Sequence, residues 1–264
     1  MTVVFAAIAP HGAPAFDDPE GETRAGFEEL ARRFASAAPE ATIVLTPHGV
    51  HVEDRFAVVL SAQLEGDASQ WTVLDTHLAC PGEPDLAMAV RDAMRADGLP
   101  VAGVTFGSSG YASSTFPLDW GALIPLWFMG GRAGVPAVVV SSSRDRPPEE
   151  HVRAGRAIAA ATAGRRVALI ASADHGHGHG EDGPYGHAPE SAEYDEQIVT
   201  LVRENRLGDL LALDPAFVDK ALADSWWQLL MLHGALGDGW QGELLSYEAP
   251  TYFGMLCAAY EPRT

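Results

Sequence analysis

Short apolar runs rich in β-branched residues alternate with longer amphipathic stretches along most of this 264-residue chain. The segments VVFAAIA (3–9), ATIVLTP (41–47) and RRVALIAS (165–172) are typical of buried strands. A helical repeat of apolar residues follows the first of them at about 21–37. Strands and helices that alternate in this way predict an α/β fold, with a central mixed or mostly parallel sheet covered by helices on both faces.

The remaining segments extend the same pattern. We expect further strands at 55–62, 71–78, 101–106, 136–143, 242–248 and 251–260, and further helices at about 84–96, 119–131, 148–163 and within 191–236. The chain contains no internal repeat and no linker of the length that separates domains. A single domain over 1–264 is therefore the simplest prediction.

The composition argues against several kinds of partner. A net charge of −19 disfavours binding to nucleic acid or to an anionic membrane. No apolar run approaches the roughly 18 residues of a membrane span, and the apolar start is too short for a signal peptide, so we expect a cytoplasmic protein. The two cysteines, Cys80 and Cys257, lie far apart, which favours small core residues over a disulfide and agrees with a reducing compartment.

The segment SADHGHGHGEDGPYGHAPE (172–190) is the most unusual in the chain. It contains four of the ten histidines and begins at the end of an expected buried strand. Glycine at alternate positions disfavours both a stable helix and an ordinary strand. A long loop inside a compact domain is commonly functional, so we expect this one to contribute to a site, although its histidine run could also bind metal adventitiously.

Polar residues able to bind metals lie at the ends of several expected strands. These residues are His11, His48, Asp174, His175, His177 and Glu248. In open α/β sheets, ligands bind beyond the carboxyl ends of the strands, so we expect these residues to meet at one edge of the sheet. Glu248 could instead be a solvated charge at the end of its strand.

Two neutral imidazoles and one carboxylate form the facial triad of non-haem Fe(II) enzymes, which leaves about three coordination positions open. Zinc is bound by similar sets, and manganese is a further alternative, so residue types alone do not fix the metal. Four other histidines carry no such signal and are expected to have ordinary core or surface roles: His51, His77, His151 and His233.

At these residues the chain resembles the class III extradiol ring-cleavage dioxygenases, the superfamily that includes the protocatechuate 4,5-dioxygenase catalytic subunit. APHG at 9–12 and TPHG at 46–49 are similar to the two histidine-ligand motifs of that family, which places His11 and His48 on the metal. The run YEAPTYFGMLCAAYEP near the end resembles the family's carboxylate segment, which makes Glu248 the third ligand.

The histidine-rich loop is similar to the family's Ser-Gly-Asp-Leu-Ser-His segment, which ends downstream in Pro-Tyr-Gly. An ungapped count from Ser172 places the family's catalytic histidine at His177, with His175 as the alternative. The segment FPLDWGALIPLWFMGG (116–131) resembles the family's Asp-x-Gly-x-x-x-Pro-Leu segment. Trp120 stands where some members have a histidine, so a role of that histidine in holding substrate would need a substitute here.

The resemblance implies an enzyme that uses Fe(II) and O2 to open a catechol-type ring beside its diol. The substrate would be a small aromatic diol, and Arg144 and Arg24 are among the arginines that could hold a carboxylate on it. Family members are commonly oligomeric, some with a small second subunit, and we expect a homo-oligomer here. The alternatives are a zinc-dependent or other metalloenzyme on the same scaffold and a non-catalytic, Memo-like binding protein.

Overall fold

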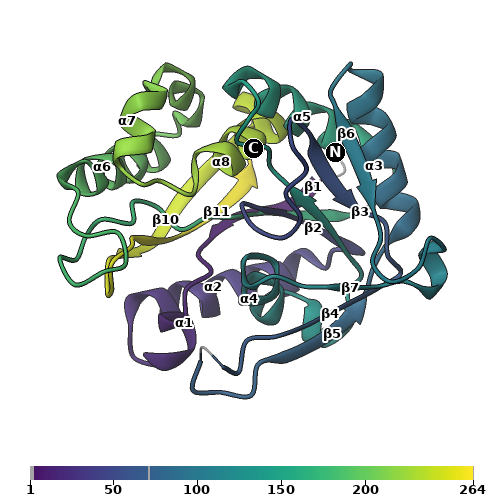
Figure 1. Cartoon of the computed structure of the whole chain (residues 1–264), viewed down its shortest axis with the longest axis horizontal. Coiled ribbons are helices and arrows are strands. Elements are labelled where there is room, and N and C mark those ends of the chain that lie inside the picture. The colour runs from purple at the N-terminus through teal and green to yellow at the C-terminus, as the bar shows by residue number, and fades with distance from the viewer. Residues whose placement is uncertain (1–2, 71, 264) are drawn as a thin grey trace.

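The computed structural model describes residues 3–70 and 72–263. Its largest element is an eight-stranded mixed sheet with the strand order β10–β11–β1–β9–β2–β8–β3–β6 (Figure 1). These strands are β1 Val3–Ala9, β2 Ala41–Thr46, β3 Phe56–Val59, β6 Val101–Val104, β8 Ala137–Ser141, β9 Val167–Ser172, β10 Trp240–Glu248 and β11 Met255–Pro262. The four central strands, β1, β9, β2 and β8, pair in parallel, whereas β11 and β3 join them on either side in the antiparallel sense.

A second, three-stranded sheet has the order β5–β4–β7 and consists of β4 Gln63–Asp67, β5 His77–Pro81 and β7 Thr115–Pro117. The strand expected at 71–78 is wrong over most of its length, because residues 72–76 form no strand and β5 begins only at His77, while residue 71 lies outside the described residues. The strands β4 and β7 contain no apolar run, because QLEGD is largely polar and TFP is only three residues long.

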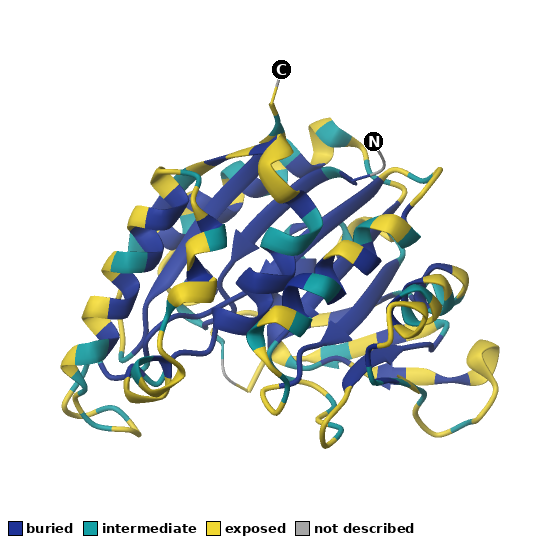
Figure 2. Ribbon diagram, turned by 90° about the horizontal axis from the view of Figure 1, so that it is seen from above, coloured by how far each residue is buried: buried dark blue, intermediate teal, exposed yellow. Residues whose placement is uncertain are grey.

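Helices cover both faces of the large sheet, which confirms the predicted α/β architecture (Figure 1). The α-helices are α1 Pro14–Asp17, α2 Glu22–Ala37, α3 Pro84–Ala96, α4 Trp120–Phe128, α5 Pro148–Ala161, α6 Pro189–Arg203, α7 Pro215–Lys220 and α8 Trp226–Leu236. Short 3₁₀ helices lie at Tyr111–Ser113, Gly131–Ala133, Leu207–Ala212 and Gly237–Gly239. The strands are buried between the helices, whose outer faces carry the exposed residues (Figure 2).

The sheet separates two hydrophobic cores. One core lies under α3, α5, α6 and α8, and the other lies under α1, α2, α4 and the small sheet. Because successive side chains of a strand point to opposite faces, β1 supplies Ala6 and Ile8 to the first core and Phe5 and Ala7 to the second. Burial of both faces explains why the central strands read as continuous apolar runs.

Both cysteines are buried and free, and both belong to the core that contains α2 and α4, as predicted. Burial raises the pKa of the Cys80 thiol to about 11 and that of Cys257 to about 12. None of the helices in the described part of the chain combines the length and the apolar character of a membrane-spanning segment. Since β1, β2, β8 and β9 run in parallel, their carboxyl ends open on the same edge, where the candidate site lies.

Candidate metal centre

His11 lies just beyond the end of β1 and is almost completely buried. Its backbone N–H donates to Asp174 Oδ1 over 2.9 Å, which ties the loop after β1 to the loop after β9. The ring Nδ1 lies 3.0 Å from Ser172 Oγ, and the single hydroxyl proton of Ser172 is donated to the carbonyl of Gly121. Ser172 must therefore accept from His11 Nδ1–H, which leaves a lone pair on His11 Nε2.

His48 follows β2 and is held by the residues around it. Its backbone N–H donates to Thr46 Oγ1, whose own hydroxyl donates to Asp119 Oδ1, the residue that caps α4. The imidazole packs against Trp120, with ring centroids 4.6 Å apart. Burial, and secondarily the neighbouring His11 ring, lower the pKa of His48 to about 4. The ring is therefore neutral at neutral pH, the state in which imidazole binds metals.

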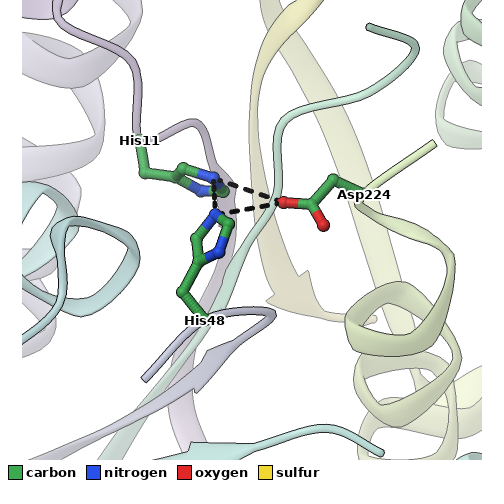
Figure 3. Close-up of side chains that lie close together, drawn as sticks. All are labelled: His11, His48 and Asp224. Carbon is green, nitrogen blue, oxygen red and sulfur yellow. Dashed lines mark hydrogen bonds and ion pairs between the residues drawn. The ribbon is translucent and has the colours of Figure 1, made fainter. Parts of the chain in front are cut away.

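Asp224 is the third member of the group and comes from the turn before α8 (Figure 3). Its Oδ1 is paired with the guanidinium of Arg144. Its Oδ2 is buried, accepts no hydrogen bond, and lies 3.3 Å from His48 Nε2 and 3.5 Å from His11 Nε2. A buried carboxylate oxygen without a donor is costly, so this atom needs a cationic or protonated partner.

The three donor atoms fit a single metal ion. The two histidine Nε2 atoms lie 3.1 Å apart, and each lies within 3.5 Å of Asp224 Oδ2. Metal–ligand bonds of about 2.1 Å place adjacent donors about 3.0 Å apart in an octahedral site and about 3.4 Å apart in a tetrahedral one. Among the described residues, one cluster of at least three potential metal ligands has donor atoms that all lie within 4.8 Å of one another, and it consists of His11, His48 and Asp224.

Glu248 does not belong to this group. The structure places it at the end of β10, where its Oε1 accepts the backbone N–H of Thr23 over 2.7 Å. Thr23 lies in the first turn of α2, and Gly21 at the N-cap of that helix has no side chain to satisfy the free N–H groups. The carboxylate of Glu248 thus caps α2 from a distant strand and complements the positive end of its dipole. The structure therefore does not bring Glu248, predicted as the third ligand, to the two imidazoles, and Asp224 is the carboxylate that lies beside them.

His177 is brought to the same edge of the sheet as the two imidazoles. Its Nδ1 lies 2.7 Å from the carbonyl of His175 and 3.1 Å from that of Leu222, so Nδ1 carries the proton and Nε2 is the basic atom. The ring stacks on Phe253 at a centroid distance of 5.3 Å. Burial lowers the pKa of His177, so the ring is a neutral base at neutral pH.

His175, the alternative for the catalytic base, is completely buried. Its Nδ1 lies 2.9 Å from Ser225 Oγ, which also contacts the hydroxyl of the buried Tyr194. Burial lowers the pKa of His175 as well. The His175 ring does not line either of the two cavities beside the metal group, whereas the His177 ring lines both. This difference favours His177 as the base.

A cavity of about 460 Å³ opens beside His11 and His48. Aromatic and aliphatic groups form much of its wall, and the polar groups that reach it include Asp174 and His177. The residues that line it are His11, Gly12, Ala13, Pro14, His48, Ala68, Thr72, Trp120, Ile124, Asp174, His177, Tyr185, Thr251, Tyr252 and Phe253. A mostly apolar cavity with a few convergent polar groups is the usual form of a small-molecule site.

The histidine-rich loop is fixed in place by a buried carboxylate. Asp195 of α6 accepts the backbone N–H of Gly176 at Oδ1 over 2.7 Å. Its Oδ2 lies 2.8 Å from both His179 Nε2 and the hydroxyl of Tyr247. His179 therefore anchors the loop to α6 and β10, and the buried charge of Asp195 is satisfied by three donors.

Two of the three glycines that alternate with histidine in this loop, Gly176 and Gly178, are required for a steric reason. A Cβ atom at Gly176 would lie 2.6 Å from Ser191 Cα, and one at Gly178 would lie 2.5 Å from Ala188 Cβ. Both contacts are with the start of α6, so only glycine permits the loop to pass so close to the helix. The loop is thus a packed segment, and its histidines serve different roles.

The four histidines expected to have ordinary roles lie outside the metal group. His51 and His77 are exposed and each pairs with a carboxylate. His151 is fully buried in α5 and donates from Nδ1 to the carbonyl of Pro147 over 3.1 Å, and burial lowers its pKa to about 4. His233 is partly buried near the end of α8, and its pKa is lowered by burial.

Asp224 is the residue of the site that sequence reasoning missed. An acidic residue followed by serine before a helical run is normally read as a helix cap. In the structure the N-cap of α8 is Ser225, which makes no side-chain capping bond, and Asp224 turns toward the imidazoles instead. The sequence offers no strong signal for this choice, because an acidic residue at a helix N-terminus is common for electrostatic reasons alone.

Comparisons with known proteins agree on one scaffold. The family model described as the catalytic LigB subunit of aromatic ring-opening dioxygenase matches residues 6–256. The protein CA_C1420 of Clostridium acetobutylicum is 25% identical over 230 residues, which are 86% of this chain and 49% of that protein, so the chain spans about half the length of this curated relative. The crystal structure of the uncharacterized protein JW3007 from Escherichia coli K12 superposes with a TM-score of 0.67 at 19% identity, covering 97% of this chain and 99% of that one, which supports the fold.

Proposed function

Because the chain belongs to the family of the catalytic LigB subunit of aromatic ring-opening dioxygenase, we propose that it is a non-haem Fe(II)-dependent extradiol dioxygenase that cleaves a catechol-type ring with O2. The observation that carries the proposal is the buried Asp224 Oδ2, which accepts no hydrogen bond and lies beside two imidazole nitrogens. Two histidines and one carboxylate are the donor set of non-haem Fe(II) oxygenases.

Ferrous iron held by this set would keep coordination positions open and supply Lewis acidity and one-electron chemistry. The residues of the chain supply binding and proton transfer. The walls formed by Trp120, Ile124 and Phe253 suit an aromatic ring, and the stacking of Phe253 on His177 fixes the plane of the base. His177 Nε2 takes a proton from a substrate hydroxyl and returns it to the product, as a neutral imidazole near neutral pH can do in both directions.

Zinc is the second candidate for the metal, and a specific distance favours it. The carboxylate oxygen of Asp224 lies 3.3 and 3.5 Å from the two imidazole nitrogens, close to the separation of about 3.4 Å in a tetrahedral zinc site. A zinc enzyme on this scaffold would act by hydrolysis or on a quinone-like substrate and would not consume dioxygen.

The proposal is tested by loading the metal-free protein anaerobically with Fe(II) or with Zn(II) and measuring oxygen uptake with a panel of catechols. The iron-loaded protein is expected to consume O2 and to form a yellow, ring-opened semialdehyde-type product, and the zinc-loaded protein is expected to do neither. His48→Ala serves as the control, because it should lose both the metal and the oxygen uptake. Oxygen uptake by neither form, with the metal stoichiometrically bound, would contradict the assignment.

A further inference from the structure

Gln228 lies in α8, one helical turn after Asp224, and its side chain is completely buried. Its amide Nε2 donates to the backbone carbonyl of Asp224 over 2.8 Å and to that of Ser172 over 3.2 Å. A primary amide carries two N–H protons, so each carbonyl receives one and both donors are used. The side chain therefore joins the start of α8 to the end of β9.

An amide is costly at this place in the chain. Among the described residues that α8 buries, Gln228 is the only one with an amide side chain. Its Oε1 is buried and has no hydrogen-bond partner among the described residues. Turning the amide over would not help, because Oε1 would then face two carbonyl oxygens. A leucine or methionine would avoid the unpaired oxygen, so the stability of α8 alone does not explain the presence of Gln228.

Both carbonyls belong to residues that position the metal group. Ser172 Oγ accepts His11 Nδ1–H and so directs His11 Nε2 at the candidate metal position. Asp224 supplies Oδ2, which lies 3.5 Å from that Nε2. Because Gln228 bonds to the backbones of Ser172 and Asp224 together, it fixes their separation, and with it the separation of two candidate ligand atoms.

The other contacts of Asp224 hold different parts of the residue. Its backbone N–H donates to the carbonyl of His175 over 3.3 Å, and its Oδ1 is paired with the guanidinium of Arg144. The bond from Gln228 is the shorter of the two backbone contacts. Gln228 thus restrains the backbone of Asp224, while Arg144 restrains its carboxylate.

We propose that Gln228 is a positioning residue of the metal centre, which holds His11 and Asp224 at the separation that a bound ion requires. The inference rests on the metal centre of the proposed function and adds a residue that lies behind two ligands at once. Partners of this kind typically change metal affinity by about 10- to 100-fold. The unfavourable burial of Oε1 is then offset by a preorganised metal site.

The test compares wild type with Gln228→Met and Gln228→Leu, two variants without side-chain N–H donors. Zn(II) affinity is measured by competition with a chelator, and the geometry of the site is followed in the visible absorption spectrum of the Co(II)-loaded protein. Both variants place an apolar side chain in an apolar helix, so the fold should be kept. We expect both to bind Zn(II) about 10- to 100-fold more weakly and to shift the Co(II) bands. Because methionine and leucine differ in shape, an effect common to both comes from the missing donors.

Trp226→Phe is the matched control. Trp226 lies in the same helix, is buried, and donates from its indole Nε1 to the carbonyl of Leu210 over 2.9 Å. It lines neither the large cavity nor a smaller one, of about 280 Å³, that opens beside His48 and Arg144. The variant also loses a buried donor to a backbone carbonyl, but it should keep the wild-type Zn(II) affinity and Co(II) spectrum.

The spectrum separates positioning from a general loss of stability, which would weaken binding without changing the geometry of the bound ion. Wild-type affinity in Gln228→Met and Gln228→Leu, or weaker binding with an unchanged Co(II) spectrum, would overturn the proposal. Neither measurement depends on turnover, so an absence of oxygen uptake contradicts the dioxygenase assignment and leaves this inference standing. A wild type that binds neither ion contradicts the metal centre and overturns both.

Discussion

His11 Nε2 and His48 Nε2 face each other across 3.1 Å, with their rings nearly perpendicular at 86°. Both nitrogens lie within 3.5 Å of Asp224 Oδ2. The bond from His11 Nδ1 to Ser172 leaves the His11 Nε2 lone pair directed at this point, and burial keeps His48 neutral with a pKa of about 4. Two facing imidazoles and a carboxylate are brought together favourably by a cation, which is the physical basis of the proposed function.

The first prediction concerns the orientation of His11. Ser172→Ala removes the acceptor that fixes the Nδ1–H tautomer, so the affinity for the metal should fall about 10- to 100-fold while the fold is kept. A competition titration with a chelator measures the change. Ser61→Ala is the matched control, because Ser61 is also a buried serine but bonds to Ser114 and lines neither cavity. Equal metal affinities in the two variants would show that Ser172 does not orient His11 for metal binding.

The second prediction concerns His177 as the base. His177→Gln should retain the metal and lower kcat by about 10²- to 10⁴-fold. His187→Gln, from the same loop, should retain activity, since His187 bonds to the carbonyl of Gly178 and lines neither cavity. Metal analysis and steady-state kinetics on both variants check this. If turnover in His177→Gln equals that of wild type, the proton transfer belongs to another group.

The pH dependence of the His177 step follows from the direction of its shift. Burial lowers the pKa of His177, so the basic form persists below the value of about 6.5 for free imidazole. The acid limb of kcat in the iron-loaded enzyme should therefore lie below about pH 6.5. A limb above that value would show that a different group limits turnover.

The third prediction concerns stability in acid. Burial lowers the pKa of His151 to about 4, whereas the unfolded chain binds this proton at about 6.5. Stability is therefore complete above about pH 6.5 and is lost as the pH falls toward 4, with a loss from this group of about 2 kcal/mol at pH 5. Urea unfolding of the metal-free protein at pH 7 and pH 5 should show a smaller pH dependence in His151→Asn. His51→Asn, at an exposed position, should keep the wild-type pH dependence.

The central strands were predictable from the sequence because burial on both faces produces continuous apolar runs. The runs at 3–9, 41–47 and 165–172 correspond to β1, β2 and β9, and the first two place His11 and His48 where the structure has them. The small sheet was not predictable, because β4 and β7 are short and are stabilised by pairing with each other and with β5.

The carboxylate of the site illustrates what the sequence could not decide. Glu248 ends the strand β10 and Asp224 precedes the apolar helix α8. Either carboxylate could supply an oxygen ligand. The deciding factor is tertiary: α2 begins at Gly21 without a side-chain cap, so Glu248 is used there, while Arg144 orients Asp224 toward the imidazoles. Contacts between segments so distant in the chain produce no periodic pattern in the sequence.

The metal content of Asp224→Asn and Glu248→Gln, loaded with Fe(II) under identical anaerobic conditions, distinguishes the two carboxylates as candidates for the third metal ligand. Asp224→Asn is expected to lose most of its iron, since an amide is a poor substitute for a carboxylate ligand. Glu248→Gln should retain iron near one ion per chain, with at most a modest loss of stability at the start of α2. Iron retained in Asp224→Asn and lost in Glu248→Gln would contradict the account.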